Sequence, residues 1–221
     1  MGLPAARRAG DLGEGRGDEI EGASSTSETG PGRGGLPRAV EVAIASLALA
    51  LASPVLLIAA IAIKLDSRGP VIYRSRRAGR AAEPFDLYKL RTMHPGHDPV
   101  GVGTPVLPGD ARVTRVGHFL RRLSLDELPN LFNVVRGELA IVGPRPTLEA
   151  QVADYTPHQR RRLEVKPGLT GWAQVNGRAG IPWEERIELD VWYVDNRSPW
   201  LDLRILGRTA RLLVTGHGLY G

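Results

Sequence analysis

Two arginines and two acids lie within seven residues of each other in the stretch RRLSLDE. Arg121 and Arg122 open this stretch, and Asp126 and Glu127 close it. Arginine binds phosphate through a planar fork of donors, and a carboxylate can act as a nucleophile or hold a metal ion. Adjacent side chains diverge by about 100° on a helix, so the two acids would have different roles. One can face a phosphorus atom while the other holds a metal.

A purely structural role would also account for these acids. Ser124 and Glu127 have the spacing of a helix capping box, and acids are favoured in the first turn of a helix. Pro129 lacks the N–H that a helix beginning at Ser124 would need at its fifth position, whereas a helix capped by Asp126 leaves that N–H free in any case. We therefore expect Asp126 to cap a helix over residues 127–135, whose N-terminus is also a site for an anion.

The stretch that must position this site is a 22-residue apolar segment, residues 42–63. It contains no charge, and its polar side chains are Ser46 and Ser53. As a helix it would be roughly 33 Å long, which is close to the roughly 30 Å hydrocarbon core of a bilayer. The segment is therefore predicted to anchor the chain in a membrane.

Two features of the segment leave its topology open. Pro54 removes one helical hydrogen bond and bends the helix, and the Ser53 hydroxyl can bond back to the preceding turn. Both flanks are rich in arginine and lysine, which favour the cytoplasmic side. A helix that breaks at Ser53-Pro54 and returns to the cytoplasmic face would keep both basic flanks on that side. A kinked helix that spans the membrane once is the alternative.

The chain has 221 residues, a formal charge of +5 and no cysteine, so disulfides and thiolate metal sites are excluded. Of its 29 basic residues, 26 are arginine and three are lysine (Lys64, Lys89 and Lys166). A basic balance suits a phosphorylated substrate, anionic lipid or nucleic acid, although an arginine-rich genome gives the same composition. Residues 1–36 are rich in Gly, Ser and mixed charge, which predicts a disordered tail.

Short elements are predicted after the apolar segment. Strands are expected at residues 71–73 and 85–88 and a buried strand at 138–142, with Gly-rich loop and strand at 166–178. Helices are expected at 113–123, 147–163, 181–196 and 200–214. The last of these is basic and amphipathic, so it can lie on an anionic surface or pack on the core. His94, His97 and Asp98 lie in a loop beside Pro and Gly, where solvated side chains are commoner than a metal site.

Several stretches of the sequence, in order and at matching spacing, resemble one family, the bacterial sugar transferases or monotopic phosphoglycosyl transferases. The resemblance runs from about Arg38 to the C-terminus. It is carried by Ser53-Pro54 and by KLDSRGPVIYRSRRAG, FDLYKLRTM, RVTRVGHFLRRLSLDELPNLFNVVRGELAIVGPRP, KPGLTGWAQVNGR and LDVWYVDN. The family often has an aspartate after the basic pair that opens the anchor, whereas this chain has Glu41 after a single Arg38.

The resemblance implies an α+β fold, mostly helical with a small sheet, anchored by a re-entrant helix and interfacial amphipathic helices. Residues 1–36 would be the tail, 37–65 the re-entrant helix, and 66–221 a catalytic domain on the cytoplasmic face of the cell membrane. It also implies transfer of a sugar-1-phosphate from a UDP-sugar to a polyprenol phosphate such as undecaprenyl phosphate, with release of UMP. That transfer initiates membrane-linked glycan assembly (exopolysaccharide, O-antigen or glycoprotein glycan).

The same resemblance assigns roles to residues. Asp126 matches the nucleophile, which would form an aspartyl-phosphosugar intermediate, and Glu127 matches the partner of a Mg²⁺ cofactor. Asp190 matches a further acid near the site. Arg145 matches an anion-binding arginine, as Arg121 or Arg122 also can. Membrane lipid is an implied partner, nucleic acid is not, and a homodimer stays open.

Two other classes of function compete with this one. A membrane-tethered, non-enzymatic binder of anionic lipid or nucleic acid would account for the charge, although aromatic residues make up only 5% of the chain. A structural adaptor would use the tail and the anchor, and would tolerate Asn and Gln at positions 126 and 127. The sequence does not distinguish among hexose, N-acetylhexosamine and modified donors.

Overall fold

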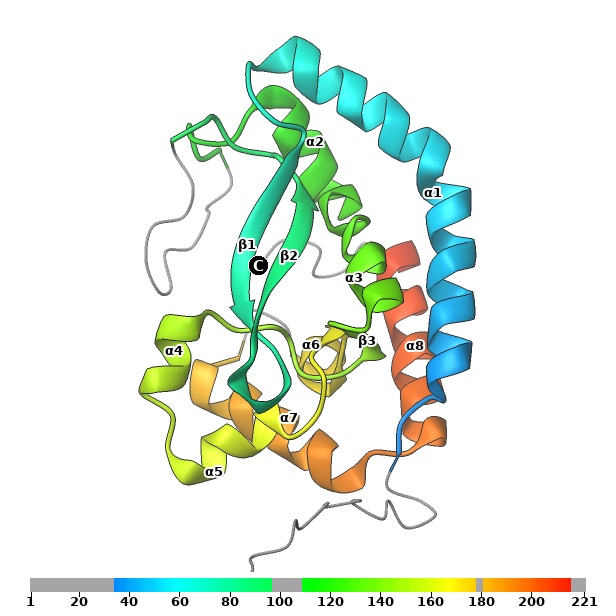
Figure 1. Ribbon diagram of the computed structural model, residues 1–221, viewed down its shortest axis with the longest axis vertical. Coiled ribbons are helices and arrows are strands. Elements are labelled where there is room, and N and C mark those ends of the chain that lie inside the picture. The colour runs from blue at the N-terminus through cyan, green and yellow to red at the C-terminus, as the bar shows by residue number, and fades with distance from the viewer. Residues whose placement is uncertain (1–33, 97–108, 178–180, 216–221) are drawn as a thin grey trace, which may run out of the picture.

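The computed structural model describes residues 34–96, 109–177 and 181–215; most of the expected tail, together with His97 and Asp98, lies outside these ranges. The described chain is mostly helical with two small two-stranded sheets, which confirms that part of the predicted fold class (Figure 1). The α-helices are α1 Arg38–Asp66, α2 Arg115–Arg122, α3 Asn130–Arg136, α4 Glu149–Ala153, α5 Pro157–Arg160, α6 Trp172–Asn176, α7 Trp183–Asn196 and α8 Pro199–Thr215. The strands are β1 Ile72–Ala78, β2 Pro84–Leu90, β3 Ala140–Val142 and β4 Gly168–Thr170.

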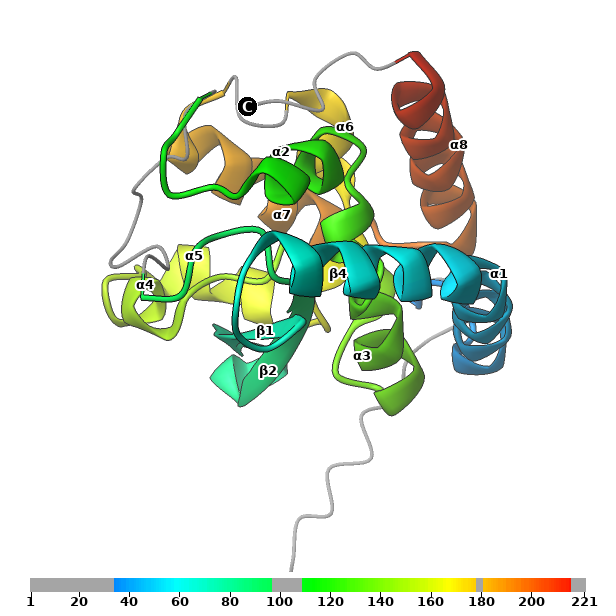
Figure 2. The same cartoon turned by 90° about the horizontal axis from the view of Figure 1, so that it is seen from above.

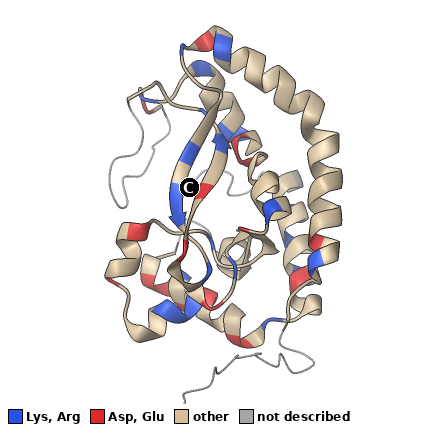
Figure 3. Cartoon of the chain, in the orientation of Figure 1, with Lys and Arg blue, Asp and Glu red and all other residues tan. Residues whose placement is uncertain are grey.

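Helix α1 is a 29-residue bowed helix that runs along one flank of the protein and curves over its upper end (Figure 1). Pro54 lies inside it, and the Ser53 hydroxyl donates to the Ala50 carbonyl at 2.7 Å. This hydrogen bond satisfies the Ala50 carbonyl, to which Pro54 cannot donate because it has no N–H, as the sequence predicts. Of the most apolar 18 residues of α1, 11% are buried within the protein. Figure 3 shows the helix without charge between its two ends.

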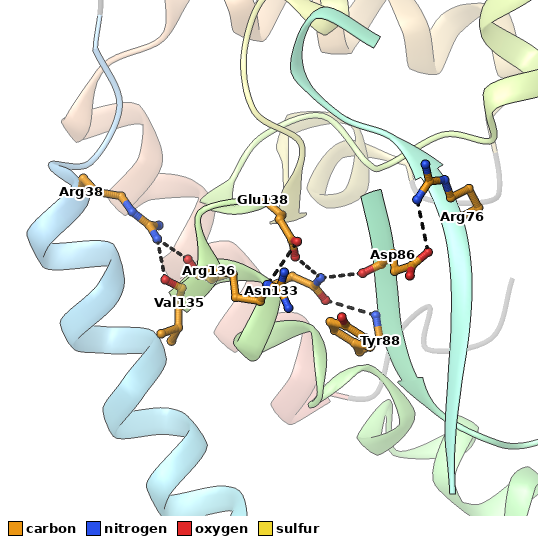
Figure 4. A network of polar contacts seen from close by, with 9 residues as sticks. Arg38, Arg76, Asp86, Tyr88, Asn133, Val135, Arg136 and Glu138 are labelled. Atoms are coloured by element: carbon orange, nitrogen blue, oxygen red, sulfur yellow. Dashed lines mark hydrogen bonds and ion pairs between the residues drawn. The ribbon is translucent and has the colours of Figure 1, made fainter. Parts of the chain in front are cut away.

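Both ends of α1 are bonded to the same body. At the N-terminal end, the Arg38 guanidinium donates to the carbonyls of Val134 and Val135 at the end of α3 (Figure 4). Glu41, which is buried, accepts from the Ile141 N–H of β3 at 3.0 Å. At the C-terminal end, the carboxylate of Asp66 accepts from the N–H of Val116 at 3.0 Å. Asp66 thereby satisfies a free donor in the first turn of α2.

Strands β1 and β2 form an antiparallel hairpin of seven residues each, longer than the two short strands predicted. Asn133 of α3 holds the hairpin in place and is fully buried. Its side chain accepts from the Tyr88 N–H at 3.1 Å and donates to the Asp86 carbonyl and to Glu138 at 2.7 Å each (Figure 4). Every polar atom of this buried amide is therefore bonded, which fixes α3 against β2.

Strands β3 and β4 are a short parallel pair in the core, with Ala140 opposite Gly168 and Val142 opposite Thr170. The predicted buried strand at 138–142 is thus confirmed. The main chain at Gly168 passes close to that of Gly143, and a Cβ on Gly168 would lie 2.1 Å from the Gly143 nitrogen. Glycine at this position allows that close approach.

One prediction for the middle of the chain is wrong, and a second, which β4 confirms in part, missed a helix. The helix expected at 147–163 is broken into α4, α5 and a 3-10 turn at Arg161–Leu163. Pro157 disfavours a helical residue before it, and Thr156 caps a new helix by accepting from the Gln159 N–H. The stretch 166–178, expected as loop and strand, also contains α6.

Helices α7 and α8 agree with the sequence prediction within two residues at each end. Helix α8 lies on the same flank as the first part of α1 (Figures 1 and 2). It buries Leu201 and Ile205 in the main core beside Val134, Leu139 and Tyr193. It also exposes Trp200, Leu203 and Leu213. Core packing and an exposed apolar face therefore occur on the same helix.

Candidate functional site

Asp126 and Glu127 lie in the elbow between α2 and α3, in a 3-10 turn at Leu125–Glu127. The expected cap is wrong: Asp126 does not begin a helix, and α3 begins at Asn130, directly after Pro129. Helix α2 ends just before Ser124, whose φ of 55° places it in the left-handed region and whose side chain makes no capping bond. A left-handed non-glycine residue costs roughly 1–3 kcal/mol and is common at functional sites.

Glu127 is the centre of a three-residue ion cluster. One of its carboxylate oxygens, Oε1, accepts from the Lys89 ammonium of β2 at 2.8 Å and from the Arg145 guanidinium at 2.9 Å. The Arg145 side chain is 55% exposed and that of Glu127 is 30% exposed, so the cluster borders solvent. Burial opposes ionisation of Glu127 and is the largest single influence. The charges and hydrogen bonds of Arg145 and Lys89 together exceed it and hold the pKa of Glu127 well below its usual value.

Asp126 has the opposite environment, although it is the adjacent residue. It is 9% exposed, and burial raises its pKa above the usual value. The charge of Glu127 raises it further, while the charges of Lys89 and Arg121 oppose the rise. Two neighbouring carboxylates whose pKa values are pushed apart are suited to different chemical roles. The sequence predicted different roles for the two acids from their side-chain directions, and their pKa values, one raised and one lowered, also differ.

A small cavity of about 30 Å³ lies beside Glu127. Its polar wall consists of Arg77, Lys89, Glu127, Asn130 and Arg145, and its apolar wall includes Leu87, Leu139 and Leu169. That volume is the scale of one water molecule. A ligand larger than water at this cluster would therefore lie largely on the open surface.

The sequence analysis did not assign Lys89, Arg77 or Asn130 to the site. The sequence did contain a signal for Lys89. It lies two residues after Leu87 and four after Phe85, so it is on the same face of β2 as these two buried side chains. A lysine on the apolar face of a strand requires an anionic partner. Arg77 shares this face, since it pairs with Phe85 in the hairpin register. Burial and the charge of Arg145 lower the pKa of Arg77.

The two arginines of α2 have different surroundings. Arg122 is exposed at the end of the helix. Arg121 is near enough for its charge to lower the pKa of Asp126. One of its guanidinium nitrogens, Nη1, is buried and makes no hydrogen bond within the described residues. Of the pair, Arg121 is therefore the one with a donor available beside Asp126.

Asp190 does not contact the acid pair in the described structure. Its carboxylate accepts from Arg162 at 2.6 Å, and both side chains are 3% exposed. Burial raises the pKa of Asp190 to about 6, although the Arg162 charge lowers it. Arg162 also donates to the main-chain carbonyl of Arg145 at 3.0 Å. Asp190 is thus linked to the site through the backbone that carries Arg145.

The residues that could hold a metal ion are few. Within the described residues there is no group of three or more His, Asp or Glu side chains arranged to bind a metal. Mg²⁺ in phosphoryl-transfer sites is commonly held by one or two carboxylates together with substrate phosphates and water. Glu127 fits such a site, since only its Oε1 is occupied by the two cations. The arrangement suits an ion that arrives with a diphosphate.

Within the described residues, fold and site together define a protein with a long, largely exposed apolar helix and a carboxylate–cation cluster. The bacterial sugar transferase family model matches residues 33–216. An uncharacterized sugar transferase, EpsL, of Bacillus subtilis is 45% identical over 184 residues, which cover 83% of this chain and 90% of the relative. This chain therefore belongs to the bacterial sugar transferase family, as the sequence motifs predicted.

Other relatives are named for their reactions. A UDP-glucose:undecaprenyl-phosphate glucose-1-phosphate transferase of Caulobacter vibrioides is 45% identical over 191 residues, covering 83% of this chain and 71% of the relative. A UDP-N-acetylgalactosamine-undecaprenyl-phosphate N-acetylgalactosaminephosphotransferase of Aeromonas hydrophila is 39% identical over 189 residues, covering 83% of this chain and 44% of the relative. The two names share an acceptor and differ in the sugar.

Proposed function

We propose that this protein transfers a sugar-1-phosphate from a UDP-sugar to a polyprenol phosphate, undecaprenyl phosphate in bacteria, and releases UMP. The observation that carries the proposal is the pair of adjacent carboxylates with opposed environments. Asp126 is buried with a raised pKa, and Glu127 is held ionised by Lys89 and Arg145. The reactions named for the relatives in Caulobacter vibrioides and Aeromonas hydrophila support the same donor and acceptor classes.

In this proposal ionised Asp126 is the nucleophile. One of its carboxylate oxygens attacks the β-phosphorus of the UDP-sugar, and the bond from that phosphorus to the bridging oxygen breaks. UMP leaves with the bond electrons, and a phosphosugar remains bonded to Asp126. A phosphate oxygen of the polyprenol carrier then attacks the same phosphorus and regenerates the Asp126 carboxylate. Dividing the transfer into two displacements replaces one difficult step by two easier ones.

The cations around Asp126 bind and orient the diphosphate. Arg145 and Lys89 present donors at one edge of the site, and Arg121 has a buried guanidinium nitrogen without a hydrogen bond. Arginine and lysine stabilise charge on phosphoryl oxygens in the transition state. Glu127 would hold Mg²⁺, which supplies charge withdrawal from the diphosphate oxygens when bound. The raised pKa makes Asp126 more nucleophilic than an ordinary aspartate, provided that it is ionised.

The membrane part of the proposal is that α1 enters and leaves the bilayer by its cytoplasmic face. Support comes from the attachment of both helix ends to one body, through Arg38 and Glu41 at one end and Asp66 at the other. Pro54 and the bend in α1 are consistent with re-entry. The exposed apolar side chains of α8 (Trp200, Leu203 and Leu213) would lie at the interface. A site at that surface meets a water-soluble donor and a lipid carrier together, as the first step of membrane-linked glycan assembly requires.

The test is UMP release by the full chain from a panel of UDP-sugars, with undecaprenyl phosphate and Mg²⁺. We expect release with at least one donor and its loss on chelation of the metal. Asp126→Asn should abolish release while the thermal unfolding temperature stays near that of the wild type. Substantial turnover by Asp126→Asn would refute the nucleophile. Labelling that places residues before and after α1 on opposite sides of the membrane would refute re-entry alone.

A further inference from the structure

Arg77 of β1 brings a further positive charge to the site beside Glu127. Within the part of the chain that the structure describes, its side chain makes one hydrogen bond, from Nε to the Ser75 hydroxyl at 3.0 Å, and no ion pair. The neighbouring Arg76, by contrast, is paired with Glu149 at 3.1 Å. Successive residues of a strand face opposite ways, so the two arginines belong to different surfaces of β1.

The charged end of Arg77 lies near the ion cluster of Glu127. Burial lowers the pKa of Arg77 most, the positive charge of Arg145 lowers it further, and the charge of Glu127 raises it. These charges act on the guanidinium, so this group, and not only the backbone of Arg77, lies near them. Its two terminal nitrogens make no hydrogen bond with the described residues, and they are not among the buried atoms that lack a partner. These donors are therefore open to a ligand that reaches the cluster.

The cluster holds more positive than negative charge. Arg77, Lys89 and Arg145 line one small cavity together with Glu127, which is held ionised. Asp126 adds at most one more negative charge, so positive charge remains in excess. Arg77 and Arg145 also repel each other, because the charge of Arg145 lowers the pKa of Arg77. An anion that joined the cluster would remove this repulsion.

The size of the cavity agrees with one oxygen of a phosphate. Its volume of about 30 Å³ is the scale of one water molecule, and a single phosphate oxygen is of similar size. The rest of the phosphate would lie outside, where the Arg145 side chain is exposed. Arginine binds phosphate oxygens through its planar fork of donors. A multiply charged diphosphate also matches the excess of positive charge.

We propose that Arg77 binds a phosphate oxygen of the donor's diphosphate at this cavity, as a further substrate-binding residue beside Arg145 and Lys89. The identity of the anion, the diphosphate of a UDP-sugar, rests on the proposed function. In the free protein the charge of Arg77 adds repulsion and no ion pair within the described residues. The ligand, and not the fold, therefore accounts for the charge at this position.

Titration of the full chain with UDP and with uridine, both in the presence of Mg²⁺, tests this without turnover. Arg77→Gln should bind UDP about ten- to a hundredfold more weakly, the loss expected for one hydrogen bond between charged groups, and should bind uridine as the wild type does. Arg76→Gln is the matched control and should leave both affinities unchanged. Wild-type affinity of Arg77→Gln for UDP, or equal losses for UDP and uridine, would overturn the inference.

The thermal stability of the free protein separates a binding role from a structural one. Without ligand, Arg77→Gln should unfold at the same temperature as the wild type or higher, because it removes the repulsion from Arg145. UDP should then raise the unfolding temperature less than it does in the wild type. A lower unfolding temperature together with the full wild-type rise on adding UDP would show that Arg77 is structural and would overturn the inference.

Arg77→Lys is the second variant, and it also serves if the glutamine variant does not fold. It keeps the charge but loses the planar fork. We expect it to bind UDP more weakly than the wild type and more tightly than Arg77→Gln, with uridine unchanged. Wild-type affinity for UDP would overturn the role of the fork, and no gain over Arg77→Gln would overturn the role of the charge.

These outcomes are separate from those of the proposed function. Absence of UMP release from every UDP-sugar would refute the transfer reaction, while the titration would still measure whether Arg77 binds the diphosphate. UMP release together with an unchanged affinity of Arg77→Gln for UDP would refute the inference about Arg77 alone.

Discussion

Two acid–arginine pairs are linked by a hydrogen bond to the main chain and differ in burial. Glu127 and Arg145 are at the surface of the site, with side chains 30% and 55% exposed. Asp190 and Arg162 are in the interior, each 3% exposed. Arg162 joins the two pairs because it donates to the main-chain carbonyl of Arg145. The outer pair is accessible to substrate, and the inner pair holds the loop that carries it.

Burial explains why similar residue types have different roles here. The inner guanidinium also donates to the Tyr155 hydroxyl at 2.6 Å and lies over the ring of Trp183. Such a cation is shielded from solvent by its own partners and is not open to a substrate. Arg145 has only one carboxylate partner in the described structure and keeps donors exposed. The comparison therefore predicts that changes in the inner pair affect stability first, and changes in the outer pair affect turnover first.

The largest expected effect is on folding. Arg162→Leu removes one partner of a buried ion pair, a change that typically costs about 3–5 kcal/mol of unfolding free energy. Urea denaturation with a folded-state probe measures this. Arg161→Leu is the matched control, since the Arg161–Asp195 pair is exposed and should contribute little to stability. Equal losses in the two variants would contradict the division between inner and outer pairs.

The next effect is on turnover. Glu127→Gln keeps the shape of the side chain but removes the charge that Lys89 and Arg145 surround. We expect UMP release to fall about 10²–10³-fold, the range found when one electrostatic contact to a transition state is removed. The unfolding free energy should fall less than in Arg162→Leu, because the cluster borders solvent. A variant that loses stability but keeps turnover would reverse the assignment.

Asp190 and Glu127 should change the stability of the protein with pH in opposite directions. The pKa of Asp190 is raised to about 6, so the folded state binds its proton more tightly than the unfolded state. Stability from this group is present below about pH 4 and is lost as the pH rises toward 6. The pKa of Glu127 is lowered, so its contribution is present above the usual glutamate pKa and is lost as the pH falls.

Urea denaturation between pH 4 and 7 tests the sign for Asp190. Asp190→Asn should be less stable than the wild type, and it should lack the wild-type fall in stability between pH 4 and 6. A parallel curve for the two proteins would show that Asp190 titrates at an ordinary value.

The smallest effect is expected at the most exposed member of the outer pair. Arg145→Lys keeps the positive charge but loses the planar fork that binds two phosphate oxygens together. We expect about a tenfold fall in UMP release, mainly through a higher KM for the donor. Initial rates over a range of UDP-sugar concentrations separate KM from kcat. An unchanged KM would indicate that Arg145 orients Glu127 without touching the substrate.

Local sequence patterns predicted much of the chain correctly. The long uncharged apolar segment identified α1, and apolar residues at helical spacing identified α2, α7 and α8. The order of the motifs identified the family. These features follow from hydropathy and from residue type, which local sequence carries. The Ser53 bond to the turn before Pro54 was also predictable, because both partners lie within one turn.

Long-range packing decided the remainder. The elbow at Ser124 replaced the expected helix start, because the direction of the chain there depends on how α2 packs on α1 and how α3 packs on α1 and β2. Lys89 reaches Glu127 across 38 residues of sequence, and Asp190 reaches the site through Arg162 and the backbone of Arg145. The sequence determined which groups can do phosphate chemistry. The tertiary structure decided which of them are buried and which border solvent, because burial and charge pairing arise from contacts between distant segments.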